Sequence, residues 1–389
     1  MAATLQAHPD TVTQQSCDGA LDAEPASPLA RLAPEQIEQL GREFDAIHDD
    51  VFADLGDRDA RYIRNVIRFH RQLVLAARVM LLGSRRRPLW LAGTAALSVA
   101  KILENMEIGH NVMHGQWDWM NDPDINSRSW DWDTASPADA WRHSHNYEHH
   151  TFTNIRGKDR DLGYEIMRID PHQPWHPVYL LQPLYNLLLM GFFEWGVALH
   201  DLNGDAIRKG EKPRGKVVEE LRAIGAKARA QIVKDYVAFP LLSGRSFRST
   251  LAANFTANIV RNVWAYSIIF CGHFPDQTYT FSEEEVAGET RGGFYVRQLL
   301  GAANIDGRPL FHLLSGNLSF QIEHHLFPDM PSSRYAEIAP RVREVCERYG
   351  LPYNTGPLHR QLGSVHRTIL RLAFPGGRVR PKPGPYRPA

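Results

Sequence analysis

The chain has 389 residues, enough for one large domain or two ordinary ones with a sizeable core. Its 44 basic and 44 acidic residues cancel, which argues against a nucleic-acid-binding protein. The three cysteines are widely spaced and form no CxxC pair, so we expect neither a disulfide framework nor a thiolate zinc site.

The two ends of the chain differ in composition from the rest. Residues 1–34 are rich in Ala, Ser, Pro, Thr and Gln, and they lack the basic and apolar regions of a secretory signal. Residues 373–389 are rich in Pro, Gly and Arg. We therefore predict a disordered arm at 1–34, one domain at 35–372, and a disordered tail at 373–389.

Three apolar segments follow one another along the predicted domain, at 88–102, 177–199 and 251–272. The second and third are long enough for a bilayer, which needs about 20 apolar residues, whereas the first suits a re-entrant or buried helix. Negative mean hydropathy keeps open the alternative of a soluble all-α protein with buried helices.

The third apolar segment carries a polar stripe. Asn254, Asn258 and Asn262 recur every fourth residue, so a helix places them on one face. Polar groups at membrane depth usually face the interior of a bundle or a site. This pattern favours an all-α membrane protein over a soluble one.

Histidines gather in three short clusters beside the apolar segments. The clusters read GHNVMHG, with His110 and His114; HNYEHH, with His145, His149 and His150; and QIEHH, with His324 and His325. The remaining histidines are mostly isolated, and an isolated histidine is more often a surface or core residue than a ligand.

The spacing of these histidines points to metal. Histidines four residues apart share one helical face, whereas adjacent histidines diverge by about 100°. Two separate HH pairs therefore suit two ions lying a few ångströms apart better than one ion. Imidazole binds Fe, Zn, Cu and Ni. A site without thiolates favours oxygen chemistry at iron over a closed structural zinc site.

The three clusters resemble the histidine boxes of the membrane fatty acid desaturases, which follow the patterns HX3–4H, HX2–3HH and H/QX2–3HH in this order. The sequences that flank the clusters also resemble this family, as in ENMEIGHNVMHGQWDWMNDP and GNLSFQIEHHLFPDMPSSRY. The likeness runs over residues 35–372 and is greatest to mycobacterial-type NADPH-dependent stearoyl-CoA Δ9-desaturases. It implies an integral-membrane helical bundle in the cell membrane, with a cytoplasmic helical cap that holds a diiron site.

The resemblance also assigns roles to residues. His273 lies outside the boxes but eleven residues after Asn262, about 20° away around a continued helix, so the two share a face. In HSHNYEHH, counting from His145 fits the second box, whereas counting from His143 does not. The implied metal ligands are His110, His114, His145, His149, His150, His273, His324 and His325. Candidates to bind metal or to orient a ligand are Gln321, Asn262, Glu107, His143, His312 and Asn317.

Other polar and aromatic residues near the boxes have less specific readings. We expect 159–161 to form a structural ion-pair turn. Arg156 and Lys158 are candidates for binding a substrate headgroup. Trp117, with the tryptophans that follow it, would line an acyl channel or anchor the protein at the membrane interface.

The reaction implied by the resemblance is O2-dependent removal of two hydrogens from a long acyl chain, which leaves a cis double bond. The substrate would be a long-chain acyl-CoA or an acyl lipid, and the cofactor two iron ions. The chain has no GxGxxG, no GxxxxGK[ST] and no HPGG haem motif. Electrons would therefore come from NAD(P)H through a separate reductase, with or without a ferredoxin.

Three alternatives remain open from the sequence. The chain could be an acyl-lipid desaturase of other regioselectivity, or a related membrane diiron hydroxylase that acts on alkanes or acyl chains. The QxxHH form of the third box favours desaturation over hydroxylation. A protein of another class, which only binds metal without catalysis, would need the same histidines.

Overall fold

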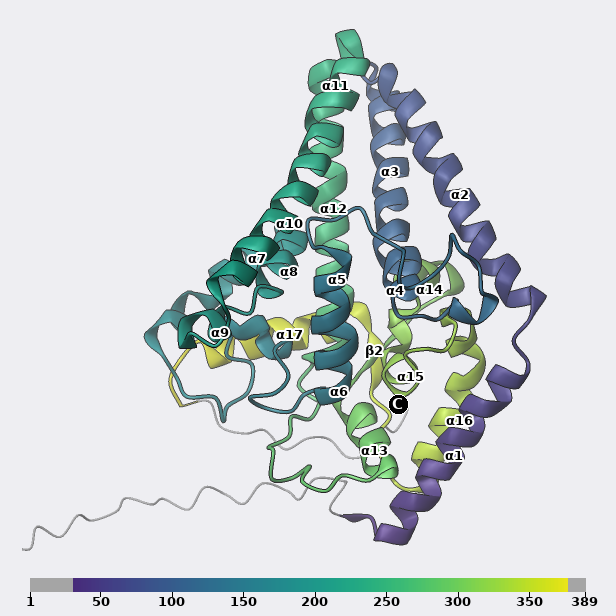
Figure 1. Ribbon diagram of the computed structural model, residues 1–389, viewed down its shortest axis with the longest axis vertical. Helices are drawn as coiled ribbons and strands as arrows, with labels where there is room; N and C mark the ends of the chain where they lie inside the picture. Colours follow the sequence, from purple (N-terminus) through teal and green to yellow (C-terminus); the bar gives the residue numbers. More distant parts are fainter. Residues whose placement is uncertain (1–30, 377–389) are drawn as a thin grey trace, which may run out of the picture.

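The computed structural model describes residues 31–376, and the structural statements below refer to that part of the chain. Long helices form a tapering upper part, and shorter elements form a broad base (Figure 1). The longer helices are α1 (Pro34–Ala53), α2 (Asp57–Leu82), α3 (Arg87–Leu103), α7 (Gln182–Gly191), α8 (Phe193–His200), α10 (Arg214–Ile232), α12 (Phe247–His273), α13 (Arg291–Gly301), α16 (Tyr335–Arg348) and α17 (Leu358–Leu372).

Short elements connect these helices. They are α4 (Asn111–Met113), α5 (Ala138–Trp141), α6 (His150–Phe152), α9 (Gly204–Lys209), α11 (Phe239–Leu242), α14 (Pro309–Leu314) and α15 (Gln321–Leu326). The described residues also hold two three-residue strands, β1 (Asn304–Asp306) and β2 (Thr355–Pro357), which pair in parallel with Ile305 opposite Gly356. The predicted all-α class is therefore confirmed, apart from this small ladder.

The upper part is built on α2, α3 and α12, which lie side by side (Figure 1). The helix α2 runs down to the base, where its buried Asp59 meets the buried Arg334 with an Nε–Oδ1 distance of 2.7 Å. A buried and hydrogen-bonded pair of this kind fixes geometry, because separating the partners would leave a charge without compensation. The upper and lower parts are thus joined by a specific contact.

The base has its own apolar core. The helix α1 buries Leu40, Phe44, Ile47 and Val51, whose spacing of three and four residues makes one helical stripe. This stripe packs against residues of α13, α15 and α16, including Val296 and Ile338, in one cluster. The core supports α15 from below, and α15 carries the third histidine cluster.

The predicted apolar segments do not all form single helices. None of the helices in residues 31–376 combines the length and the apolar composition that crossing a membrane requires. Segment 177–199 is not one continuous helix, because Phe192 leaves helical geometry (φ −120°, ψ 35°) between α7 and α8. Segment 251–272 lies within the unbroken α12, whose asparagine stripe is buried as expected.

His110 of the first histidine cluster and His145 and His149 of the second lie on π-helical turns. These are η2 (Glu104–His110), which continues α3, and η4 (Arg142–His149), which continues α5. A π-helical turn bonds residue i to i+5, so it shifts the angular position of every side chain relative to an α-helix, and such turns concentrate at functional sites. The apolar periodicity of the sequence does not indicate them.

A close approach of α1 to α13 generates a testable prediction. A Cβ atom on Gly292 would lie 1.9 Å from the carbonyl oxygen of Ile37, and one on Gly41 would lie 3.1 Å from the Cα of Gly292. We expect Gly292→Ala to lower the free energy of unfolding by about 1–3 kcal/mol, as overpacking does. Denaturant unfolding of the purified protein measures this.

The matched control is Gly225→Ala in the exposed interior of α10, where a Cβ atom would meet nothing within 4 Å. Alanine should stabilise that helix by about 0.5–1 kcal/mol through its helix propensity. If the free energy of unfolding changed in the same direction in both variants, the result would contradict the close contact between α1 and α13.

Candidate metal centre

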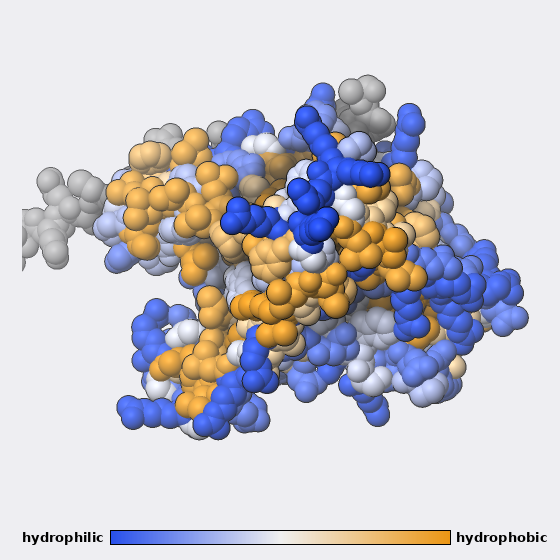
Figure 2. Space-filling model, turned by 90° about the horizontal axis from the view of Figure 1, so that it is seen from above, coloured by the Kyte–Doolittle hydropathy of each residue, from blue (hydrophilic) through white to orange (hydrophobic). Residues whose placement is uncertain are grey.

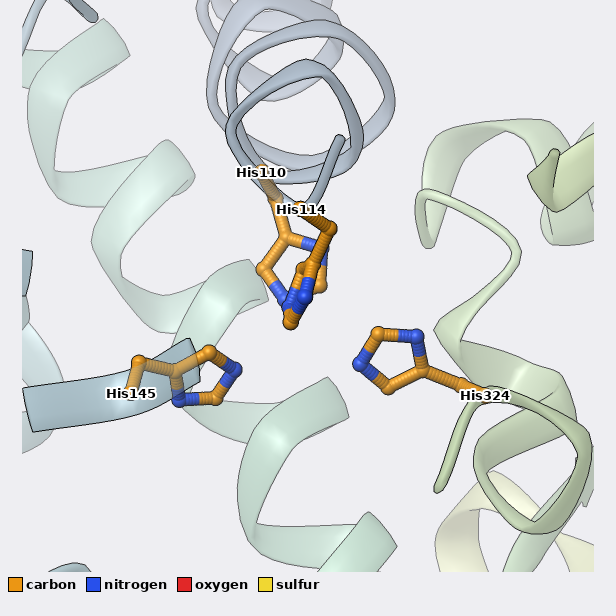
Figure 3. Close-up of side chains that lie close together, drawn as sticks. All are labelled: His110, His114, His145 and His324. Carbon is orange, nitrogen blue, oxygen red and sulfur yellow. The ribbon is translucent and has the colours of Figure 1, made fainter. Parts of the chain in front are cut away.

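Histidines from all three clusters converge between the upper part and the base. His110, His114, His145 and His324 form one group, in which four ligand nitrogens lie within 4.8 Å of one another. Figure 3 shows the four rings reaching toward a common centre from three segments of the chain. We call these four residues the first group.

A second group lies beside the first. It consists of His149, His273 and His325, whose ligand nitrogens also lie within 4.8 Å of one another. His273 is the last residue of α12, and the Nε2 atoms of His273 and His325 are 3.2 Å apart. The adjacent His324 and His325 belong to different groups, as their divergence around α15 predicts.

His150 lies between the two groups. Its ring centroid is 4.7 Å from that of His114 and 4.5 Å from that of His325. Both of its ring nitrogens are buried without a hydrogen-bond partner. A buried nitrogen without a hydrogen-bond partner is unfavourable. The His150 ring is therefore suited to binding a metal ion that lies next to either histidine group.

Neighbouring side chains orient the rings from outside. The Nδ1 of His324 donates to the hydroxyl of Tyr335, 3.2 Å away, which itself donates to the carbonyl of Phe327. The Nδ1 of His325 donates to Oε1 of Gln298 at 2.9 Å, and Gln298 in turn donates to a backbone carbonyl. These contacts leave the Nε2 lone pairs of both histidines facing inward, the arrangement typical of histidine metal ligands.

The first cluster has a similar partner in its own sequence. The Nδ1 of His110 lies 3.0 Å from Oδ1 of Asn111, whose amide donates to the carbonyls of Glu107 and Gly316. Because the amide group of Asn111 is used as a donor, its oxygen accepts from His110. Asn111 therefore holds the His110 ring, a role that no pattern in the sequence indicates.

Two aspartates hold the second cluster. Both carboxylate oxygens of Asp159 lie 3.1 Å from Nδ1 of His149, and Asp161 lies 3.4 Å from Nδ1 of His145 and 2.9 Å from His200. The sequence predicts a structural ion-pair turn here. All three residues of the turn have ion-pair partners: Arg160 pairs with Glu148 and Glu165, and the two aspartates pair with histidines.

The protonation states of the histidines suit metal binding. Burial, assisted by repulsion from His145, lowers the pKa of His110 to about 3, and burial lowers that of His324 well below its usual range. Imidazole binds metal in its neutral form. For His149, burial opposes protonation, but the charges of Asp159 and Asp161 outweigh it and raise the pKa to about 9. A metal entering the second group would displace that proton.

Inward-facing nitrogens provide a direct test of whether a metal fits. Within the described residues, the Nε2 atoms of His114, His145 and His324 are buried and have no hydrogen-bond partner. An unsatisfied buried polar atom costs about 1–3 kcal/mol, so several in one place call for a shared ligand. The donor set is rich in imidazole and free of thiolate, so it fits iron or another imidazole-binding metal.

Gln321 contacts the second group. Its amide nitrogen lies 3.0 Å from Nε2 of His273, and its Oε1 is buried without a partner. The residue needs the space left by Gly272, because a Cβ atom there would lie 2.8 Å from Gln321. Gln321 is thus placed either to bind a metal through its oxygen or to orient His273.

Glu107 and Asn317 lie beside the site but bond to each other. The carboxylate of Glu107 accepts hydrogen bonds from Tyr62, Asn317 and Ser332 at 2.8–3.0 Å, and its burial raises its pKa to about 7. Neither side chain has a hydrogen bond to a histidine ring among the described contacts. Glu107 reaches His110 only through its backbone carbonyl and Asn111.

The remaining ligand-orienting candidates are farther from the histidine groups. Asn262 donates to the carbonyl of Gly191 and accepts from Arg261. The side chain of His143 is 67% exposed and lies 3.5 Å from Glu148, which places it outside both groups. His312 bonds to Ser319 at 2.7 Å and stacks on Phe320.

The candidate substrate residues occupy different surroundings. Arg156 is partly buried beside Asp170, and Lys158 forms an ion pair with Glu283 at the surface. Trp117 is fully buried and stacks on Tyr62, so it packs in the core near the first cluster. None of the three lines the cavity that reaches the histidines.

A cavity opens onto both histidine groups. His110 and His145 of the first group and His273 of the second form part of its wall, together with Gln321. Much of the remaining wall is apolar or aromatic, contributed by Met106, Trp132, Trp141, Tyr164, Phe193, Val197, Ala265 and Ile269. A cavity of this kind suits an apolar ligand held next to the histidines.

Comparisons with known proteins identify the same histidine clusters with a protein family. A family model described as fatty acid desaturase matches residues 88–357, which include all three histidine clusters. An NADPH-dependent stearoyl-CoA 9-desaturase of Mycobacterium tuberculosis is 49% identical over 351 residues, covering 89% of this chain and 82% of the relative. An sn-1 linoleoyl-lipid 6-desaturase of Synechocystis is 26% identical over 280 residues, covering 69% of this chain and 76% of the relative. The chain therefore belongs to the fatty acid desaturase family.

Proposed function

We propose that the protein uses O2 to introduce a cis double bond at the Δ9 position of a stearoyl-CoA-like long-chain acyl-CoA. The observation that carries the proposal is the largely apolar cavity that reaches both histidine groups. The specific substrate and position are supported by the similar mycobacterial protein, which is named for NADPH-dependent stearoyl-CoA 9-desaturation.

The proposed cofactor is a pair of iron ions. His110, His114, His145 and His324 would hold one ion, and His149, His273 and His325 the other, with His150 between them. Bound iron supplies the O2 activation that removing hydrogen from an unactivated methylene requires, because no side chain can take such a hydrogen by acid or base chemistry. The sets of buried unpaired nitrogens and inward Nε2 atoms support this assignment.

The protein's own contribution would be positioning and exclusion of water. Met106, Trp132 and Ile269 give the cavity an apolar surface on which methylene groups can lie. The outer partners Asp159, Gln298 and Tyr335 hold the rings in fixed orientations. A rigid wall would present one pair of methylenes to the site and not its neighbours, which is how positioning selects a bond.

Electrons are proposed to reach the site from NAD(P)H through a separate reductase, with or without a ferredoxin. The chain contains no glycine-rich dinucleotide motif, and the mycobacterial relative is named as NADPH-dependent. An electron carrier of another chain would therefore complete the reaction.

The proposed location is the cell membrane, with the histidine site facing the cytoplasm. Large apolar side chains are exposed on several helices of the upper part, and Figure 2 shows them as orange patches around hydrophilic side chains. They include Leu75, Val79, Leu184, Leu187, Leu241, Leu242 and Phe255, each more than half exposed. Exposed apolar side chains gathered in this way indicate a lipid or protein surface.

The reaction is tested by product analysis. We expect the iron-loaded protein, given stearoyl-CoA, O2, NADPH and a reductase, to form oleoyl-CoA, identified by gas chromatography and mass spectrometry. A hydroxylated product would instead indicate a hydroxylase, and a product only from acyl lipid would indicate an acyl-lipid desaturase. Iron binding without substrate-dependent O2 uptake would contradict any enzymatic function.

Two histidine variants test the site. We expect His149→Ala to lower iron content and activity together, because it removes a buried ring of the second group. His143 lies six residues before His149 on the same π-helical turn, but its side chain is exposed. His143→Ala should therefore leave iron content and activity at the wild-type level. Iron is measured per chain by metal analysis. Equal losses in the two variants would contradict this division of roles.

The membrane proposal is tested with lipid vesicles. We expect the wild-type protein to float with vesicles in a density gradient, and the double variant Leu241→Glu with Leu242→Glu to float less. Each charge would have to be buried in hydrocarbon, which costs about 2.5–3.5 kcal/mol at the centre of a membrane helix and less near its surface. Flotation of neither protein would contradict a membrane location.

A further inference from the structure

We propose that the Glu194–Arg261 ion pair closes the far end of the acyl cavity and thereby limits the length of the acyl chain that the enzyme accepts. The inference rests on the proposed function, since it takes the cavity as the site of the acyl chain. Four observations carry it: the wall formed by α12, the burial of the pair, its bonds to other elements, and the polar interior beyond it.

One face of α12 forms a wall along the cavity. Asn262, Ala265, Ile269 and His273 line it, with spacings of three, four and four residues that place them on one stripe. The eleven residues from Asn262 to His273 extend over about 16 Å of helix axis. His273 belongs to the second histidine group, so Asn262 marks the opposite end of the wall.

The ion pair lies at that opposite end. Glu194 of α8 also lines the cavity, and it pairs with Arg261, the neighbour of Asn262 on α12. The side chains of Arg261 and Glu194 are only 1% and 5% exposed. The pair is therefore a buried element of the structure and not a surface contact.

Further hydrogen bonds hold both members in place. Gln231 of α10 donates to Glu194 at 2.7 Å, and Arg261 donates to the carbonyl of Asp133 at 3.3 Å and to Asn262 at 3.1 Å. A buried pair with these added bonds resists separation, because an apolar group offers neither member a replacement partner. A terminal methyl group that reaches the pair should stop there.

The interior of the upper part remains polar beyond the pair. Asn258, one turn farther along α12, donates to Tyr236 at 2.9 Å and to Asp235 at 3.3 Å. Asp235 is fully buried and pairs with Arg78 at 3.0 Å and with Lys101 at 2.7 Å. Asn258 and Asn262 of the asparagine stripe therefore belong to a buried polar network at this end of the cavity.

Narrowing the wall provides the first test. Ala265 lies one turn below Arg261 on the cavity wall, and Ala265→Leu would add three carbon atoms there. Rates are measured with saturated acyl-CoA thioesters of increasing length. We expect kcat/KM for the longest accepted chain to fall by about 10–200-fold relative to shorter chains, the range for one methylene that no longer fits.

The matched control is Val260→Leu, on the same helix but 40% exposed and outside the cavity lining. It adds a methylene to α12 without entering the cavity. We expect its ratio of rates for long and short chains to equal that of the wild type.

Removing the barrier provides the second test. Glu194→Val and Arg261→Leu are combined in one protein, so that neither charge is left buried alone. We expect this double variant to accept longer chains than the wild type, with the double bond at the same position relative to the thioester. Iron content and helical content should match the wild type.

The outcomes separate this inference from the proposed function. A wild-type protein that desaturates no acyl thioester would overturn both. Wild-type activity with unchanged length profiles in Ala265→Leu and in the double variant would overturn only the barrier. Loss of iron from Ala265→Leu and from the double variant, with normal iron content in Val260→Leu, would also overturn it. The substituted residues would then stabilise the fold and would not limit the length of the acyl chain.

Discussion

The structure depends on packing eight imidazole rings together in a largely buried site. The centroids of neighbouring rings lie about 4.5–5.5 Å apart. Charged rings could not approach so closely in a dry interior, so burial must keep most of them neutral, and the direction of their pKa shifts agrees. Neutral rings in turn leave lone pairs unsatisfied, which a shared metal can satisfy. A bound metal would therefore stabilise this arrangement of closely packed rings.

Much of the surrounding fold serves to aim these rings. The helix α13 supplies Gln298 to His325, the start of α16 supplies Tyr335 to His324, and the loop after the second cluster supplies the two aspartates. The long helix α12 links the site to the upper part, since its lower end is His273 and its middle carries the polar contacts that close the cavity. One helix thus connects the chemistry to the position of the acyl chain.

The histidine clusters and the divergence of His324 from His325 could be predicted from the sequence, because adjacent residues on a helix point in different directions. The separation of His145 from His149 into different groups could not, because a spacing of four residues predicts a shared face on an α-helix, whereas this turn is π-helical. Gln298 and Tyr335 could not, because they come from other helices and carry no pattern of their own. The ion pairs of Asp159 and Asp161 could be predicted, but their histidine partners could not, because an Asp-Arg-Asp turn does not indicate which cations it contacts. Glu107 was a candidate because it lies three residues before His110, but η2 is π-helical and bonds over five residues, so this spacing does not place the two side chains as an α-helix would. The break at Phe192 directly follows Gly191, but a single glycine in an apolar segment does not by itself establish that a helix ends there.

The central claim is that the two histidine groups hold two separate metal ions. Anomalous diffraction at the iron absorption edge, from crystals of the iron-loaded protein, tests this most directly. The account predicts two peaks of comparable height, one among His110, His114, His145 and His324, and one among His149, His273 and His325. A single peak, or iron bound outside these histidines, would contradict it.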